Sequence, residues 1–238
     1  MADDGNTALV IGASGGLGSA MLAQLRADAR FTQVLSLSRS RVEHGAPSLD
    51  IADEQSIAAS AEWLQKQCAA QPLRLIVVAT GFLHSEGAGP ERSLAQLDAA
   101  YLRQGFAINT IGPALLLKHL APLLPKSGEA KIVFISAKVG SIGDNALGGW
   151  YGYRASKAAL NQIVKTASIE LARRNKSACC VALHPGTIDT ALSEPFGKGG
   201  LNVREPALAA QEILEVIEQL TPQDNGRFVD YLGQGLPW

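Results

Sequence analysis

Short apolar runs alternate along the chain with longer segments in which apolar residues recur at helical spacing. The runs predict strands over residues 7–12, 33–37, 46–50, 73–80, 131–136, 178–183 and 227–232. The longer segments predict helices after the first strand up to about residue 29, and over residues 53–70, 97–124, 150–175 and 206–220. The strands consist mainly of Val, Ile and Leu, which is typical of a parallel sheet covered on both faces. We therefore expect an α/β fold, a doubly wound parallel sheet with helices on both faces, as a single domain over residues 1–238.

Two interruptions of this pattern carry further expectations. The helix predicted over residues 97–124 contains Gly112-Pro113, which predicts a kink. Residues 186–205 form the longest irregular stretch, and a loop of about 20 residues in a compact domain is typical of a lid or binding loop. We expect a substrate lid around residues 187–205.

The composition excludes several classes of protein. The 238 residues are 47% hydrophobic and 18% charged, which excludes long disorder, and the net charge of −1 gives no reason to expect nucleic acid or an anionic membrane as a partner. No apolar run is long enough to span a bilayer, and the acidic first residues do not resemble a secretion signal. Cys68, Cys179 and Cys180 lack metal-ligand spacing, so we expect free thiols, a cytoplasmic location and no metal.

A glycine-rich turn follows the first predicted strand. The segment Gly12-Ala13-Ser14-Gly15-Gly16-Leu17-Gly18 places glycines where the strand meets the first helix. Glycine allows a tight turn and a close approach of backbone N–H groups to a pyrophosphate at the helix N-terminus. The alternative is simple helix–strand packing. We expect cofactor contacts at Gly12, Ser14, Gly15, Gly16, Leu17 and Gly18.

The end of the second strand indicates which dinucleotide would bind. An acidic residue there would favour NAD, whereas a basic residue favours the 2′-phosphate of NADP. The sequence has no acid at this point and has Arg39 and Arg41. Arginine presents a forked set of donors to phosphate. We expect NADP, with NAD possible, the alternative being two solvated loop arginines.

Tyr153 and Lys157 lie near the start of the long helix predicted over residues 150–175, at an i, i+4 spacing that puts them on one face. A neighbouring ammonium stabilises phenolate and lowers the pKa of a tyrosine toward the working range of an acid–base catalyst. The same spacing is common in helices without function. Together with the glycine turn upstream, this pair is the main indication of function in the sequence.

With these motifs, the chain resembles a short-chain dehydrogenase/reductase of the compact, single-domain type with a Rossmann fold. The segments Gly140-Ser141-Ile142-Gly143-Asp144-Asn145 and Gly148–Asn161 resemble the branch of C-factor proteins and sniffer-type carbonyl reductases. The end of the chain, Phe228-Val229-Asp230-Tyr231 and Leu236-Pro237-Trp238, resembles the same branch.

The resemblance implies roles for three residues. Tyr153 would be the acid–base, Lys157 would orient the nicotinamide ribose, and Asn109 would complete a proton relay. Pro113 has no N–H, so the Asn109 carbonyl would lack its helical partner and be free to hold a water linked to Lys157. The alternative is a helix kinked by Gly-Pro with a packed asparagine.

Two departures from the family pattern stand out. The serine that usually ends the fifth strand falls on Ala137, with Ser136 one place early. Either a bulge turns Ser136 inward, or Ser141 substitutes, or Tyr153 works without this helper; Ser136 is our candidate. In addition, the family's Asn-Asn-Ala-Gly run after the fourth strand reads Val-Ala-Thr-Gly here, ending at Gly81.

The remaining site residues rest mainly on the resemblance. Asp50 resembles the adenine-contacting acid, although a plain loop acid is an equal alternative, and Pro185-Gly186 resembles the turn beside the nicotinamide. His184 is expected to be packed, and Trp150 and Phe196 are candidates for the substrate pocket. The further cofactor-contacting residues expected are Asp50, Ile51, Thr80, Gly81, Pro185, Gly186, Thr187 and Thr190.

These inferences predict an NADP-dependent oxidoreductase that transfers hydride between the nicotinamide and a small carbonyl or alcohol substrate. The family commonly pairs through the helices here over residues 97–124 and 150–175, which predicts a homodimer or homotetramer. One alternative is an NADP(H)-binding signalling or regulatory protein with little turnover. Another is an epimerase or dehydratase of the same fold, for which 238 residues leave little room.

Overall fold

The computed structural model describes residues 5–40, 45–85, 89–193 and 202–238. Its centre is a six-stranded sheet in the order β2-β1-β3-β4-β5-β8, in which every pair of neighbours is parallel. The strands are β1 (Asn6–Ile11), β2 (Phe31–Leu37), β3 (Leu73–Val78), β4 (Ala130–Ile135), β5 (Ala178–His184) and β8 (Phe228–Asp230). The predicted doubly wound parallel sheet is confirmed.

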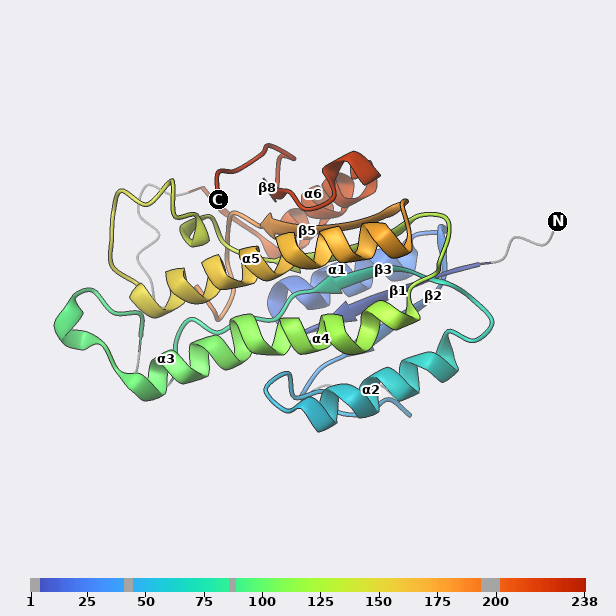
Figure 1. Cartoon of the computed structure of the whole chain (residues 1–238), viewed down its shortest axis with the longest axis horizontal. Helices are drawn as coiled ribbons and strands as arrows, with labels where there is room; N and C mark the ends of the chain where they lie inside the picture. Colours follow the sequence, from blue (N-terminus) through green and yellow to red (C-terminus); the bar gives the residue numbers. More distant parts are fainter. Residues whose placement is uncertain (1–4, 41–44, 86–88, 194–201) are drawn as a thin grey trace.

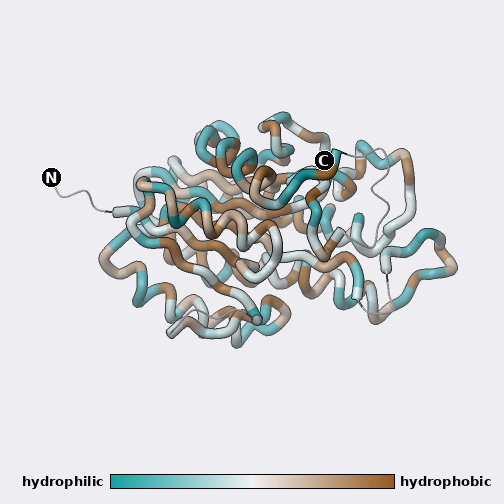
Figure 2. Tube along the Cα trace, turned by 180° about the vertical axis from the view of Figure 1, so that it is seen from behind, coloured by the Kyte–Doolittle hydropathy of each residue, from teal (hydrophilic) through white to brown (hydrophobic). Residues whose placement is uncertain are grey.

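Helices cover both faces of this sheet. The α-helices are α1 (Gly16–Ala27), α2 (Glu54–Gln67), α3 (Ala99–Phe106), α4 (Gly112–Leu120), α5 (Tyr151–Arg174) and α6 (Pro206–Gln219). Helices α2, α4 and α5 lie in front of the sheet in Figure 1, and α1 and α6 lie behind it. Seen from behind, the strands form the brown, hydrophobic interior of the molecule (Figure 2).

The alternation of side chains along each strand divides the core into two clusters. On one face, Ile11, Ile76 and Phe134 pack with residues of α2, α4 and α5 such as Ile57 and Leu160. The residues between them on the same strands belong to a second cluster, which packs against α1 and α6. Both clusters hold the carboxyl ends of the strands at one edge, where ligands bind in folds of this kind.

The strand expected over residues 46–50 is wrong. Residues 45–50 form a turn and irregular chain, with one backbone hydrogen bond from Leu49 N to Ser38 O, 3.1 Å long. Pro47 explains the difference, because it has no N–H to donate to a neighbouring strand.

The helix expected over residues 97–124 is present as several consecutive pieces. Between α3 and α4, residues Ala107–Ile111 (η2) form a turn of π-helix, with Gly112 N bonded to Ala107 O. Pro113 follows directly, in the first turn of α4, and has no N–H to donate to the π-turn before it. The irregularity that the sequence predicts as a proline kink is therefore a π-turn centred on Asn109.

The region predicted as a lid begins and ends in a short ribbon. Strand β6 (Thr187–Ile188) pairs in parallel with β7 (Val203–Arg204). Residues 194–201, with the pocket candidate Phe196, lie outside the described residues, as does Arg41. The lid assignment stays a prediction.

Within the described ranges, no helix is long and apolar enough to cross a membrane, and no group of His, Cys, Asp and Glu side chains is arranged to bind a metal ion. All three cysteines are free thiols. Cys179 and Cys180 are buried on β5, and burial raises the pKa of the Cys179 thiol to about 12.

Candidate active site

The glycine turn after β1 is built by two close backbone approaches. Gly12 has a φ of +87°, in the left-handed region, and a Cβ there would lie 2.8 Å from the Ala79 carbonyl oxygen. A Cβ on Gly18 would lie 2.3 Å from the Gly12 carbonyl oxygen. These positions require glycine, and they let α1 begin at Gly16 directly behind the turn.

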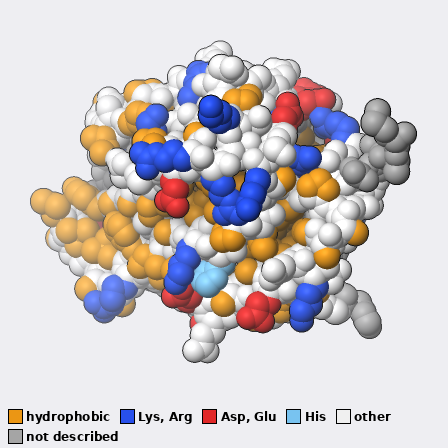
Figure 3. Space-filling view, turned by 45° about the vertical axis from the view of Figure 1, so that its right-hand side comes forward, with side chains coloured by type: hydrophobic (Ala, Val, Ile, Leu, Met, Phe, Trp, Pro, Cys, Tyr) orange, Lys and Arg blue, Asp and Glu red, His pale blue; other side chains and the backbone are white. Residues whose placement is uncertain are grey.

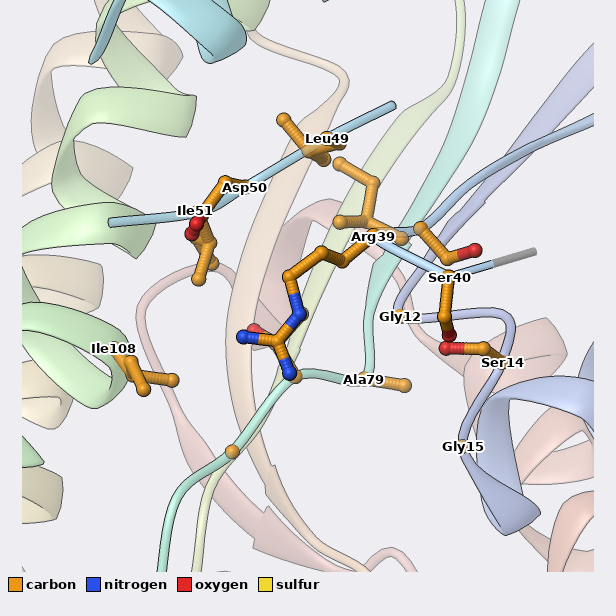
Figure 4. Close-up of a pocket in the computed structure, with 14 residues that line it drawn as sticks. Gly12, Ser14, Gly15, Arg39, Ser40, Leu49, Asp50, Ile51, Ala79 and Ile108 are labelled. Carbon is orange, nitrogen blue, oxygen red and sulfur yellow. The ribbon is translucent and has the colours of Figure 1, made fainter. Parts of the chain in front are cut away.

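The turn forms one wall of a cavity of about 230 Å³ at the carboxyl edge of the sheet (Figure 4). Its lining unites segments that are distant in the sequence: the turn, the end of β2, the loop before α2, the end of β3 and the π-turn. The predicted site residues that line it are Gly12, Ser14, Gly15, Arg39, Asp50, Ile51, Thr80 and Gly81.

Arg39 is the basic residue of this cavity. Its side chain is exposed and extends from the end of β2 into the cavity, with the guanidinium between Ile108 and Ala79 (Figure 4). Asp50 lies in the loop before α2, where its Oδ1 accepts a hydrogen bond of 3.0 Å from Ala52 N. The cavity therefore presents one permanently charged donor fork to solvent.

Other predicted cofactor residues lie around the cavity without lining it. The Leu17 side chain belongs to the core between the sheet and α1. Thr190 lies over the glycine turn, because its Cγ2 is 2.9 Å from the position that a Cβ on Gly16 would take. The segment after β5 and the glycine turn thus meet on the same side of the sheet.

Tyr153 and Lys157 are buried on the first two turns of α5, where the tyrosine is 9% and the lysine 2% exposed. Lys157 Nζ lies 5.9 Å from the centre of the Tyr153 ring and donates a hydrogen bond of 2.9 Å to Ile135 O. Burial lowers the pKa of Lys157 to about 8.

The pKa of Tyr153 does not move in the expected direction. Burial raises it above its usual value, and the neighbouring Tyr101 adds to the rise. The physical reason is that the phenolate would lose its hydration among Leu83 and Ala137, which pack against the ring. The expected lowering by Lys157 is therefore wrong for the protein chain on its own.

Asn109 is fixed by its side chain. Its Oδ1 accepts from Phe82 N at 2.8 Å, and its Nδ2 donates to Phe82 O at 2.8 Å and to Ser156 Oγ at 3.0 Å. Asn109 Oδ1 and Lys157 Nζ each lie 3.9 Å from the position that a Cβ on Gly81 would take. The structure thus brings Asn109 and Lys157 together at the end of the cavity that Gly81 lines.

Ala137 occupies the place beside Tyr153, in the same apolar cluster. Ser136 N continues the strand ladder to Leu183 O at 2.7 Å, and Ser136 Oγ donates to Asn161 Oδ1 at 2.6 Å. Ser141 Oγ bonds to Trp238 O at 3.3 Å. The hydrogen bonds of both serines are made to groups other than Tyr153.

Contacts from Arg204, on β7, hold the turn that follows β5. Arg204, on β7, is 4% exposed, donates to Pro185 O, pairs with Glu212 and lies 3.5 Å over the Tyr231 ring. Gly186 has a φ of +72°, as a tight turn requires. His184, expected to be packed, is half-buried at the end of β5, and burial lowers its pKa to about 4.

Several residues of the site have no signal in the sequence pattern. Ile108 and Ala79 line the cavity, Ser156 links α5 to Asn109, and Glu91 is buried against the start of α5. The serine is within the Tyr153–Lys157 segment and accepts an amide proton from the π-turn. A charged residue of a loop, such as Glu91, reads from sequence as solvated surface, so only the fold reveals its burial.

Comparison with known proteins gives the family. The family model described as short chain dehydrogenase matches residues 6–199. The "C-signal" of Myxococcus xanthus is 35% identical over 147 residues, which cover 61% of this chain and 84% of that protein. The "1-hydroxy-2-glutathionyl-2-methyl-3-butene dehydrogenase" of Rhodococcus sp. (strain AD45) is 32% identical over 192 residues, covering 81% of this chain and 79% of that protein.

Solved structures agree with the fold. An NADPH-bound carbonyl reductase from chicken fatty liver superposes with a TM-score of 0.85 at 24% identity, over 98% of this chain and 94% of that one. The carbonyl reductase Sniffer of D. melanogaster also gives 0.85 at 24% identity, over 98% and 99%. The resemblance to the C-factor branch is confirmed, as is the enzyme class, an NAD(P)-dependent oxidoreductase. The chain belongs to the short chain dehydrogenase family.

Proposed function

We propose that this protein is an NADP-dependent oxidoreductase that transfers hydride between the nicotinamide and a small carbonyl or alcohol substrate. The observation that carries the proposal is the position of Lys157 Nζ and Asn109 Oδ1. Both lie near Gly81, which lines the same cavity as Arg39. Groups for proton transfer and a group for an anionic cofactor therefore share one cleft.

The residues present fit this cofactor. Thr80 Oγ1 is buried at the cavity wall without a hydrogen-bond partner among the described residues, as a donor or acceptor for a ligand would be. The glycine turn and the start of α1 would hold the pyrophosphate, and Arg39 the 2′-phosphate. When bound, NADP(H) donates or accepts the hydride at its nicotinamide.

Three side chains have roles in the reaction. Tyr153 transfers the proton to or from the substrate oxygen. Lys157, with donors beyond its bond to Ile135 O, orients the ribose. Asn109, whose side chain is hydrogen-bonded to Phe82 and Ser156, completes the proton relay from a fixed position. The raised pKa of Tyr153 favours the protonated phenol, the form that donates to a carbonyl oxygen.

Because residue 137 is alanine, the site lacks the serine hydroxyl that the family pattern has at this position. No hydroxyl lies at that position to donate to the substrate oxygen. The loss of one such hydrogen bond raises the activation free energy of a reaction by about 3 kcal/mol. We therefore place Ser136 and Ser141 outside the reacting groups. The apolar surroundings of Tyr153, formed by Leu83, Ala137, Val139 and Trp150, favour an uncharged carbonyl substrate.

The experiment follows the near-ultraviolet absorbance of NADPH with a panel of aldehydes, ketones and quinones. Tyr153→Phe is compared with Tyr151→Phe, a matched control because Tyr151 lies in the same helical turn and is 36% exposed. We expect turnover by the wild type and by Tyr151→Phe and none by Tyr153→Phe. Equal rates for the three proteins would refute the assigned role.

A second candidate function rests on Ala137. Together with the similarity to the C-signal of Myxococcus xanthus, the missing hydroxyl supports a signalling or regulatory protein that binds NADP(H) with little turnover. Tight NADPH binding without oxidation by any member of the panel would favour this function over the first.

We also propose a homodimer or homotetramer through α4 and α5. Hydrophobic side chains gather over the face formed by these helices, at the left of Figure 3. Ile111, next to the start of α4, and Ile169, on α5, are 53% and 51% exposed. Light scattering of the wild type and of Ile169→Glu tests this assembly, which predicts a smaller particle for the variant.

A further inference from the structure

Helix α5 carries Tyr153 and begins without a cap of its own. Its N-cap residue is Trp150, which has a φ of +53° and makes no side-chain hydrogen bond to the helix N-terminus. The first N–H groups of a helix have no partner within it and require one elsewhere. A 24-residue helix that positions an acid–base residue in its first turn thus depends on another segment for its start.

Glu91 supplies the missing partner from a different part of the chain. Its Oε2 accepts a hydrogen bond of 3.1 Å from Gly152 N, the residue immediately before Tyr153. Its backbone oxygen accepts from Trp150 N at 2.5 Å. Two groups of Glu91 therefore hold the N-cap and the second residue of α5.

The side chain of Glu91 is unusual for a carboxylate in a loop. The residue is 3% exposed, and its Oε1 is buried without a hydrogen-bond partner among the described residues. Burial of a charged group is costly, and the positive end of the helix dipole is the compensation that this geometry offers. A carboxylate kept here at such a cost has a role beyond covering the surface.

Gly152 is the complementary half of the contact. A Cβ at this position would lie 3.0 Å from Glu91 Oε1 and 2.8 Å from Leu102 Cδ2 on α3. The absence of a side chain thus allows both the carboxylate and α3 to approach the first turn of α5. Glycine in a helix costs stability, so its presence agrees with a need for this approach.

The same loop is fastened to the other parts of the site. Phe82 is held by the Asn109 amide, and Leu83 O accepts a hydrogen bond of 2.6 Å from the Tyr101 hydroxyl. Leu83 packs against Tyr153. Glu91 is therefore the last of three anchors that connect the loop after β3 to the helices around Tyr153.

We propose that Glu91 is a positioning residue for Tyr153: its carboxylate caps helix α5 in trans through Gly152 N and so fixes the phenol for proton transfer. The inference rests on the proposed function for its catalytic consequence. The capping contact itself is independent of turnover.

The test compares Glu91→Ala, Glu91→Gln, Gly152→Ala and the control Glu170→Ala, which removes an exposed carboxylate from the same helix. The loss of a cap and of tight geometry should lower kcat of Glu91→Ala by about tenfold. Its dissociation constant for NADPH should change less than twofold. Glu91→Gln keeps an oxygen acceptor for Gly152 N and should recover most of kcat, whereas Glu170→Ala should match the wild type.

Hydrogen–deuterium exchange provides a readout that needs no substrate. In Glu91→Ala and Gly152→Ala, amides of the first turn of α5 should exchange faster, while those of β4 and β5 keep their protection. If Glu91→Ala retains wild-type kcat and wild-type exchange, the proposal is wrong. Should Glu91→Ala fail to fold, Glu91→Gln and Gly152→Ala decide through the same two measurements.

The two proposals fail in different ways. A wild-type protein without NADPH oxidation would contradict the proposed function, and faster exchange in Glu91→Ala would still establish the cap. Normal turnover by the wild type with equal kcat losses in Glu91→Ala and Glu91→Gln would contradict the role of the hydrogen bond. A parallel loss of kcat and NADPH affinity would show general damage and would also overturn the positioning role.

Discussion

Replacing Arg39 with alanine should separate NADPH from NADH. The two cofactors differ only at the 2′-phosphate, and Arg39 is the charged donor of the cavity in which we place it. Removing the guanidinium should therefore weaken the binding of NADPH and leave the binding of NADH unchanged.

The size of the effect follows from the exposure of the side chain. Two unit charges 4 Å apart attract by about 1 kcal/mol in water and by about 4 kcal/mol near a protein surface. Because Arg39 is exposed, its contribution belongs to the lower half of this range, about 2 kcal/mol. That free energy corresponds to about a 30-fold rise in the dissociation constant of NADPH.

The assay is a fluorescence titration of wild type, Arg39→Ala and Arg173→Ala with each cofactor. Arg173 is exposed in the last turn of α5, and its replacement is the control for a general change in charge. The preference of the wild type for NADPH should also shrink as salt screens the contact. If Arg39→Ala weakens NADH as much as NADPH, or if the wild type prefers NADH, the assignment of Arg39 to the phosphate is refuted.

Three further predictions concern groups buried near the site. NADPH affinity should fall as the pH rises through about 8, where Lys157 loses its proton, and Lys157→Met should abolish this dependence in calorimetric titrations. Burial lowers the pKa of His184 from 6.5 to about 4, so the unfolded chain binds its proton more readily than the folded one. This contribution to the free energy of unfolding is present above pH 6.5 and is lost as the pH falls toward 4. In urea unfolding, the loss of stability over this pH range should be about 2 kcal/mol smaller for His184→Gln than for the wild type. Gly18→Ala should destabilise the fold by about 2 kcal/mol and weaken NADPH binding, because its Cβ meets the Gly12 carbonyl; thermal unfolding should show no change for Gly89→Ala, where no atom lies within 4 Å.

The sequence predicts the elements of this fold well where each has a strong local pattern. The apolar runs give five of the sheet strands to within a few residues, because a parallel strand buried on both faces has few polar positions. The run at 46–50 fails since Pro47 removes a donor, a local feature that outweighs the surrounding pattern. The sixth strand, β8, is short but correctly placed.

Only part of the candidate site can be predicted from the sequence, because only some of its residues lie in contiguous motifs. The glycine turn and the Tyr153–Lys157 pair are contiguous motifs, whereas the orientation of Asn109 depends on a π-turn that no spacing announces. The pKa of Tyr153 depends on burial by residues from several segments, so the pair alone gives the wrong direction. Ser136 likewise depends on strand register, which directs its hydroxyl to Asn161.

The strand order has a consequence for the synthesis of the protein. Once β3 has joined β1 and β2, each later strand adds to the same edge of the growing sheet, next to the strand made before it. Strand β5 ends at His184, and its outer edge pairs with β8, beginning at Phe228. The nascent chain therefore carries an open β5 edge while more than forty further residues are translated, about 2 to 9 s at ordinary rates. An unpaired edge of this kind invites association with other strands. Chains that stop before residue 228 are therefore expected to aggregate or be degraded, although they contain Tyr153, Lys157 and the whole glycine turn.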